Sequence, residues 1–216
     1  LDCVSEERIA EELSRLLAAP APGAYLEAEV LAVIFPELDA AELPESRRIL
    51  DALEPGMEHV PVRLAALLCP LGEAGARAAL KRLKCSNALT GMVATLVREA
   101  AAEMPGAALT LTARRFLSRY DLATITDLTA LCSARHPEQA EAFAALQQEA
   151  ARLVETNACC RINQLAVNGR DLMDAGIRPG PGLRRVLDAL LEQVLTGQLP
   201  NEKAALLAAA AQVAAS

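Results

Sequence analysis

Residues 60–71 read VPVRLAALLCPL, and this stretch decides the fold class that the sequence predicts. The run is almost wholly apolar, which is typical of a helix surrounded by other helices, since a surface helix keeps one polar face. The segments on both sides show apolar residues at helical spacing and are separated by Pro or Gly. We therefore expect residues 60–71 to form a central, buried helix.

Composition extends this expectation to the whole chain of 216 residues. Ala and Leu together make up more than a third of it, aromatic residues only 2%, and Trp is absent. Strands draw on β-branched and aromatic residues, so this mixture favours helices. We predict an all-α fold of about ten helices, with residues 164–167 as the one candidate strand. A membrane span is not expected, because every stretch of about 20 residues contains charges.

Local signals place several helix boundaries. Ser5 is a candidate N-cap for a first helix, Thr112 for a short basic helix and Asn201 for the last helix. The stretch 165–182, LAVNGRDLMDAGIRPGPG, is dense in Gly and Pro and indicates a rigid connection around one short helix.

Cysteine usage and motif searches argue against a self-contained active site. The six cysteines show no C-x-x-C spacing and only two histidines accompany them, so zinc ligation is not expected. We interpret them as thiols of a protein in the reducing cytoplasm. Neither a phosphate-binding glycine loop nor a nucleophile with a histidine base is present. The sequence predicts no catalytic residue and no metal site.

Charge is distributed unevenly, although the total of −7 and the pI of about 5.0 argue against a uniformly RNA-binding surface. Residues 1–76 carry a net −10, whereas residues 77–119 carry a net +6. A basic stripe of this kind is expected to contact a phosphate backbone, and a solvated helix face is the alternative. The candidate contacts are Arg77, Lys81 and Lys84 on one helical face, Arg82, and Arg114, Arg115 and Arg119.

Secondary candidates surround the Gly- and Pro-rich stretch. A helix that begins near Gly182 would present free backbone N–H groups to a phosphate, and a purely structural turn is the alternative. The basic residues there are Arg170, Arg178 and Arg184.

Four stretches resemble, in order, motifs of bacterial tRNA nucleotidyltransferases, the CCA-adding and poly(A)-polymerase-like class. They are VSEERIAEEL (4–13), LKRLKCSN (80–87), AVNGRDLMDAGIRPGPG (166–182) and LPNEKAALL (199–207). The resemblance covers nearly the whole chain. It implies neck-type helices at 1–43, a helical body at 44–156 and a tail at 157–216.

The resemblance also implies a division of labour. In the family a catalytic head binds ATP, CTP and divalent metal such as Mg²⁺, whereas body and tail hold tRNA. The head's signature has no counterpart here, so we expect this chain alone to be inactive and to bind tRNA.

One departure concerns the buried helix at 60–72, which in many relatives and in HD-type phosphohydrolases ends in a metal-binding His-Asp pair. Cys69 and Pro70 occupy that pair here. Because Pro cannot bind a metal, HD-type hydrolysis is disfavoured. A degenerate hydrolase and a helical protein-interaction module, including a homodimer, stay open as alternatives.

Overall fold

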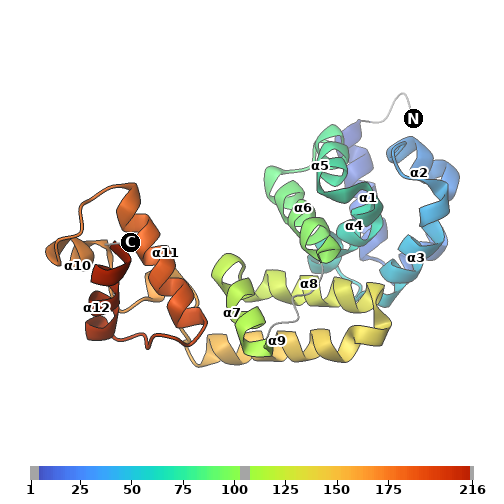
Figure 1. The fold of residues 1–216 in the computed structure, drawn as a ribbon. Coiled ribbons are helices and arrows are strands. Elements are labelled where there is room, and N and C mark those ends of the chain that lie inside the picture. Colours follow the sequence, from blue (N-terminus) through green and yellow to red (C-terminus); the bar gives the residue numbers. More distant parts are fainter. Residues whose placement is uncertain (1–4, 103–107, 215–216) are drawn as a thin grey trace. The chain divides into compact units, whose positions relative to one another are not determined.

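The computed structural model describes residues 5–102 and 108–214, and the secondary structure in them consists of helices (Figure 1). The α-helices run from α1 to α12, with short 3-10 helices between several of them. This confirms the all-α fold class. None of the helices in these residues is long and apolar enough to cross a membrane.

The described residues divide into two compact units, one from residues 5–102 and 126–144 and the other from 108–125 and 145–214. α8 (Leu122–Arg135) and α9 (Ala140–Glu155) contribute residues to both. The remaining α-helices of the first unit are α1 (Glu6–Ala18), α2 (Ala28–Ile34), α3 (Leu43–Ala52), α4 (Val60–Leu68), α5 (Gly72–Arg82) and α6 (Asn87–Ala101).

α4 forms the centre of the first unit, as the apolar run predicts. It contacts α1, α3, α5 and α6 (Figure 1). All but one of its nine residues are buried. Its one charged residue, Arg63, is only 1% exposed. Its guanidinium donates hydrogen bonds to the carbonyl oxygens of Leu17, Ala19 and Leu53. The buried helix therefore holds the end of α1 through a charge as well as through packing.

Helix starts in this unit follow their capping residues. The Ser5 hydroxyl accepts a hydrogen bond from the Arg8 N–H at 3.4 Å, which confirms Ser5 as the N-cap of α1. Ser86 plays the same part for α6, where its hydroxyl accepts from the Leu89 N–H at 3.2 Å. Both caps satisfy a backbone N–H that has no partner within the helix.

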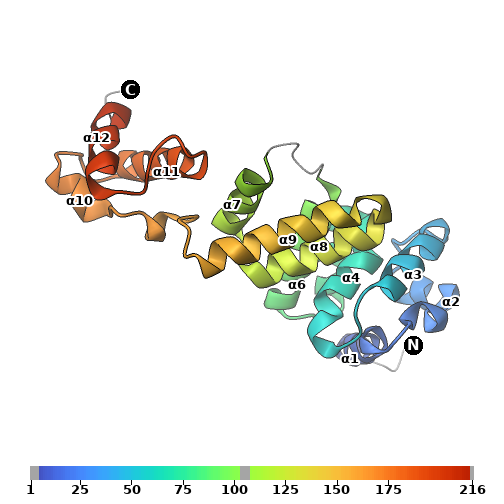
Figure 2. The same ribbon diagram turned by 90° about the horizontal axis from the view of Figure 1, so that it is seen from below.

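The second unit contains α7 (Leu109–Arg119), α10 (Gly169–Asp174), α11 (Pro181–Leu195) and α12 (Lys203–Ala214). α10, α11 and α12 pack against one another (Figures 1 and 2). Their shared core is aliphatic and is built on Leu172, Leu190 and Leu206, none of which is exposed. α7 contacts α11.

Residues 164–167 do not form the candidate strand. Gln164 ends a 3-10 helix, and no strand lies beside the segment among the described residues. Leu165 and Val167 are both buried in the core of the second unit. Asn201 binds the segment instead: its side chain accepts from the Ala166 N–H at 2.8 Å and donates to the Gln164 carbonyl at 2.9 Å.

Two predicted N-caps are therefore wrong. Asn201 serves the neighbouring loop, while α12 begins at Lys203 and its Leu206 N–H bonds to the Glu202 carbonyl. Thr112 lies inside α7 and is buried, and its N–H makes a helical bond to Ala108. An N-cap needs non-helical backbone angles, and a helix that begins three residues earlier removes them from Thr112.

Candidate nucleic-acid interface

α5 carries three of the predicted phosphate contacts, and two of them have carboxylate partners. Arg77 Nη2 lies 3.0 Å from Glu73 Oε1, and Arg82 Nη2 lies 2.9 Å from Glu37 Oε2. Lys81 is exposed and makes no ion pair with the residues that the structure describes. Intramolecular pairs therefore compete with a nucleic acid for Arg77 and Arg82.

Lys84 lies beyond the end of α5 and does not share the helical face predicted for it. Its φ of +53° places it in the left-handed region, where the Cys85 N–H closes the helix with a 3.0 Å bond to the Leu80 carbonyl. Lys84 Nζ lies 3.2 Å from Glu6 Oε2 and 3.0 Å from Glu7 Oε1. The pKa values of the Glu6 and Glu7 carboxyls are lowered by hydrogen bonds from their own backbone N–H groups and from the Lys84 ammonium. Lys84 thus balances charge at the start of α1.

The arginines of α7 contact the last turns of α11. Arg114 Nη1 donates to the carbonyl oxygens of Val194 and Leu195 at 3.0 and 3.1 Å. Those carbonyls lie at the helix end that carries partial negative charge, which a cation stabilises. Arg115 Nη2 lies 2.6 Å from Glu192 Oε1. Both side chains therefore join α7 to α11.

The Arg119 guanidinium lies over two nearby aromatic rings. Its guanidinium carbon is 5.4 Å from the centre of the Phe116 ring and 5.3 Å from that of Tyr120. Both distances fall within the range of a cation–π contact. Its Nε also points at the Arg115 carbonyl, at 3.4 Å.

The secondary candidates near the Gly- and Pro-rich stretch have different surroundings. Arg170 and Arg178 are exposed and make no ion pair with described residues. Arg184 is exposed too, and its Nε lies 3.1 Å from Asp188 Oδ1. The neighbouring Arg185 is exposed without such a partner. We call Arg170, Arg178, Arg184 and Arg185 the tail arginines.

A cavity of about 730 Å³ lies between the end of α10, the start of α11 and the last turn of α12. Arg178 and Arg185 line it together with the Gly182 backbone. Gly176 and Gly180, with φ of +94° and +131°, let the chain turn from α10 into α11. The turn therefore gathers two guanidinium groups beside one concave surface.

Exposed cations without a carboxylate or carbonyl partner are concentrated in this region. Over residues 5–102 and 108–214, three of the five such side chains fall between positions 170 and 185. The five are Arg8, Lys81, Arg170, Arg178 and Arg185.

Sequence reasoning missed Arg185, although a local signal distinguishes it from Arg184. Residues four apart on a helix are neighbours, and position 188 supplies a carboxylate to Arg184. The corresponding neighbour of Arg185 is Ala189, which has no carboxylate to pair with that guanidinium.

The sequence profile described as tRNA nucleotidyltransferase domain 2 (putative) matches residues 58–210, most of the chain. The chain belongs to this family. The match includes part of the first unit, most of the second unit and all four tail arginines.

Curated proteins that are similar to this member of the tRNA nucleotidyltransferase family come from several bacteria. The CCA-adding enzyme of Lactiplantibacillus plantarum is 30% identical over 222 residues, which cover 99% of this chain and 52% of the relative. The CCA-adding enzyme of Levilactobacillus brevis is 64% identical over 45 residues, covering 21% and 11%. The CC-adding tRNA nucleotidyltransferase of Shouchella clausii is 48% identical over 46 residues, covering 21% and 12%.

Nearly the whole of this chain is matched, but it spans only about half the length of the L. plantarum enzyme. No solved structure matches it.

The two family-like motifs at 166–182 and 199–207 meet in the structure. Lys203 Nζ lies 2.6 Å from Asp171 Oδ1, and the other oxygen of Asp171 accepts from the Asn168 N–H at 2.9 Å. Lys203 and this N–H lower the pKa of the Asp171 carboxyl. Side chains of the two motifs therefore hold α10 to the start of α12.

The Cys69–Pro70 pair directly follows α4 in a 3-10 helix. Burial raises the pKa of the Cys69 thiol, which keeps it protonated at neutral pH. In the described part of the chain, no three His, Cys, Asp or Glu side chains are grouped so that they could hold a metal ion.

Proposed function

We propose that this chain is the tRNA-holding part of a tRNA nucleotidyltransferase. It binds the acceptor and T arms so that a catalytic head can extend the 3′ end with CMP and AMP. The observation that carries the proposal is the group of exposed tail arginines within the segment that matches the family, three of which have no partner among residues 5–102 and 108–214. Family membership supports a tRNA substrate, because curated relatives are named as CCA-adding and CC-adding enzymes.

The chemistry of the region fits contact with a phosphate backbone. Guanidinium groups form charge-assisted, bidentate hydrogen bonds with phosphates. Aromatic residues make up only 2% of the chain, so stacking on unpaired bases offers little area for binding. A protein that must accept many tRNAs gains from this, since backbone contacts orient a nucleic acid without reading its sequence.

Nucleotidyl transfer belongs, on this proposal, to the head, where Mg²⁺, CTP and ATP bind. We assign no step of that reaction to residues of this chain.

Titrating fluorescent tRNA with the 216-residue chain at several salt concentrations tests the proposal. We expect affinity to fall linearly with log salt concentration, because each neutralised phosphate releases a counterion. The double variant Arg178→Ala/Arg185→Ala should weaken binding about tenfold or more. It should also reduce the salt slope by about 2, or about 1 per phosphate contact.

The matched control is Arg8→Ala/Arg15→Ala, which removes the same charge from α1 outside the segment that matches the family. It should leave affinity and slope nearly unchanged. Undetectable or salt-insensitive binding would contradict the proposal and favour a protein-interaction module. If both double variants weakened tRNA binding equally, the tail arginines would not be the surface that contacts tRNA.

A further inference from the structure

The position of Arg178 depends on α10, the short helix that precedes it. α10 has six residues, Gly169–Asp174, whereas isolated helices shorter than about 12 residues are marginal in water. Leu172 is buried in the core of the second unit and anchors α10 there. Hydrophobic burial is non-directional, so this contact alone does not fix the direction in which α10 points. Hydrogen bonds and ion pairs of its polar side chains supply that direction.

Asp171 uses both of its carboxylate oxygens for contacts of this kind. Oδ2 accepts from the Asn168 N–H at 2.9 Å, and Asn168 Oδ1 accepts in return from the Asp171 N–H at 3.1 Å. This reciprocal capping box closes the start of α10. Oδ1 lies 2.6 Å from Lys203 Nζ, and the Asp171 side chain is only 19% exposed. A short contact that is partly shielded from water is stronger than a typical surface ion pair.

Lys203 offers this carboxylate a fixed partner, because the loop before α12 is bound at its other side. The Asn201 side chain accepts from the Ala166 N–H and donates to the Gln164 carbonyl. Lys203 follows two residues later as the first residue of α12. The start of α12 is therefore held to the segment around residues 164–166.

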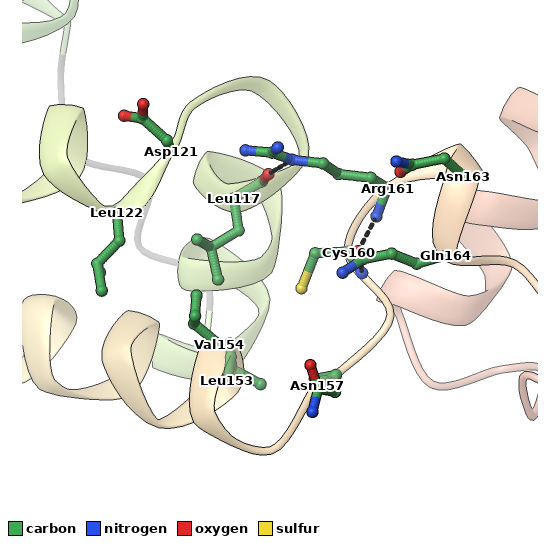
Figure 3. Close-up of a pocket in the computed structure, with 11 residues that line it drawn as sticks. Leu117, Asp121, Leu122, Leu153, Val154, Asn157, Cys160, Arg161, Asn163 and Gln164 are labelled. Atoms are coloured by element: carbon green, nitrogen blue, oxygen red, sulfur yellow. Dashed lines mark hydrogen bonds between the residues drawn. The ribbon is translucent and has the colours of Figure 1, made fainter.

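That segment is in turn held to α7. Gln164 Oε1 accepts from the N–H groups of Cys160 and Arg161, both at 2.9 Å, which closes the turn around the 3-10 helix (Figure 3). The Arg161 side chain donates through Nε to the Leu117 carbonyl of α7 at 2.8 Å (Figure 3). A continuous series of hydrogen bonds thus runs from α7 to the start of α12, and the Asp171 pair extends it to α10.

The far end of α10 leads into a wall of the cavity that the tail arginines share. The Ile177 N–H bonds to the Leu172 carbonyl at 3.0 Å and closes the helix. Residues 175–178 line the cavity directly after this closure, and the last turn of α12 lines it as well. The Asp171–Lys203 pair therefore joins two of the helices whose ends form the cavity.

We propose that Asp171 is a positioning residue for tRNA binding, which holds α10 to α12 so that Arg178 and Arg185 contact phosphates together. This role rests on the proposed function and deepens it. A carboxylate repels phosphates, and both oxygens of Asp171 already accept from protein groups. Asp171 therefore acts on tRNA only through the arginines.

The direction of the change in Asp171→Asn separates positioning from a simple charge effect. The substitution removes a negative charge from the unit that carries the tail arginines, so electrostatics alone predicts stronger tRNA binding. The new side chain keeps one oxygen for the Asn168 N–H, but its NH₂ group cannot accept from Lys203. Loss of the link between α10 and α12 predicts weaker binding instead.

Titration of fluorescent tRNA at several salt concentrations measures this change, at a temperature at which the parent chain and the variant are both folded. Asp171→Asn should bind tRNA about tenfold more weakly, as for the loss of one charged contact. The salt slope should fall by about 1, because one of the two guanidinium groups no longer reaches its phosphate. A lower melting temperature with unchanged affinity and slope would show a purely structural role and overturn the proposal.

The matched control is Asp174→Asn, three residues further along the same helix. Asp174 is exposed and makes no ion pair with the residues that the structure describes, so the variant removes the same charge without breaking a link. It should leave tRNA binding unchanged or slightly stronger. If it weakened binding as much as Asp171→Asn does, the loss would not depend on the pair with Lys203, and the proposal would fail.

A double-mutant cycle tests whether Asp171 acts through Lys203. Lys203→Gln should weaken tRNA binding by a similar factor, and Asp171→Asn/Lys203→Gln should be no weaker than either single variant, since all three remove the same link. Additive losses would mean that the two side chains act separately, which contradicts positioning through the pair.

The parent chain separates this role from the proposed function. If it binds tRNA and Asp171→Asn binds equally well or more tightly, the positioning role alone is refuted. If the parent chain does not bind tRNA, the proposed function is refuted and the positioning role with it.

Discussion

The arginines of α4 and α7 and the arginines around the α10–α11 turn have the same side chain and opposite surroundings. Arg63 and Arg114 donate to backbone carbonyls at helix ends, whereas Arg178 and Arg185 face solvent without a described partner. A guanidinium that already binds carbonyls has few donors left for a phosphate. Local density of positive charge therefore does not identify a nucleic-acid surface, because the neighbours of each cation decide whether it is available.

The largest expected effect comes from Arg63, the most deeply buried of these arginines. Arg63→Leu should lower the free energy of unfolding by about 3 to 5 kcal/mol, because three carbonyls lose their partner and each buried unsatisfied group costs about 1–3 kcal/mol. Urea denaturation measures the change. Arg8→Leu, at an exposed position, is the control and should have little effect. A loss below about 1 kcal/mol would mean that water replaces the guanidinium at no cost.

Replacing Arg114 should have a smaller effect on stability. Arg114→Leu should lower the free energy of unfolding by about 2 kcal/mol, since two carbonyls at the end of α11 lose a charged donor. Once the variant is folded, the salt slope of tRNA binding should stay within error of the parent chain. If the slope falls by about 1 instead, Arg114 neutralises a phosphate and the division between structural and available arginines fails.

The smallest expected effect on stability concerns Arg152, whose guanidinium pairs with the Glu149 carboxylate. Its guanidinium and the Thr110 hydroxyl lower the pKa of Glu149 to about 2. A folded-state pKa below the unfolded one stabilises the protein above about pH 4.5, and this contribution is lost as the pH falls toward 2. Glu149→Gln should thus be less stable at pH 7 by about 1 kcal/mol, since the pair is partly open to water.

Thermal melts of the parent chain and Glu149→Gln between pH 7 and pH 2.5 measure this contribution. The gap between their melting temperatures should close as the pH falls below about 4.5. A gap that is constant over this range would show that Glu149 is not the titrating group.

Much of the fold could be predicted from the sequence. The apolar run at 60–71 predicts a buried central helix, and α4 with the following 3-10 helix occupies that position. Ser5 was identifiable as an N-cap because its role depends on residues only three positions away. Patterns of this range are local, and the backbone satisfies them without reference to the rest of the molecule.

The failures involve partners that are distant in sequence. Asn201 has the composition of an N-cap but bonds to residues 164 and 166, some 35 positions earlier. Thr112 is not an N-cap, because the helix begins at Leu109 and Thr112 lies inside it. For the candidate site, charge density drew attention to Arg114, whereas its carbonyl partners lie 80 and 81 positions further along. A single sequence carries no signal for such pairings.

The all-α class, the central helix and the family-like motifs can be predicted from the sequence, because helical periodicity and short motifs depend on neighbouring residues. Which cations are available depends on the tertiary structure, because it determines whether a distant carbonyl or carboxylate comes within hydrogen-bond distance.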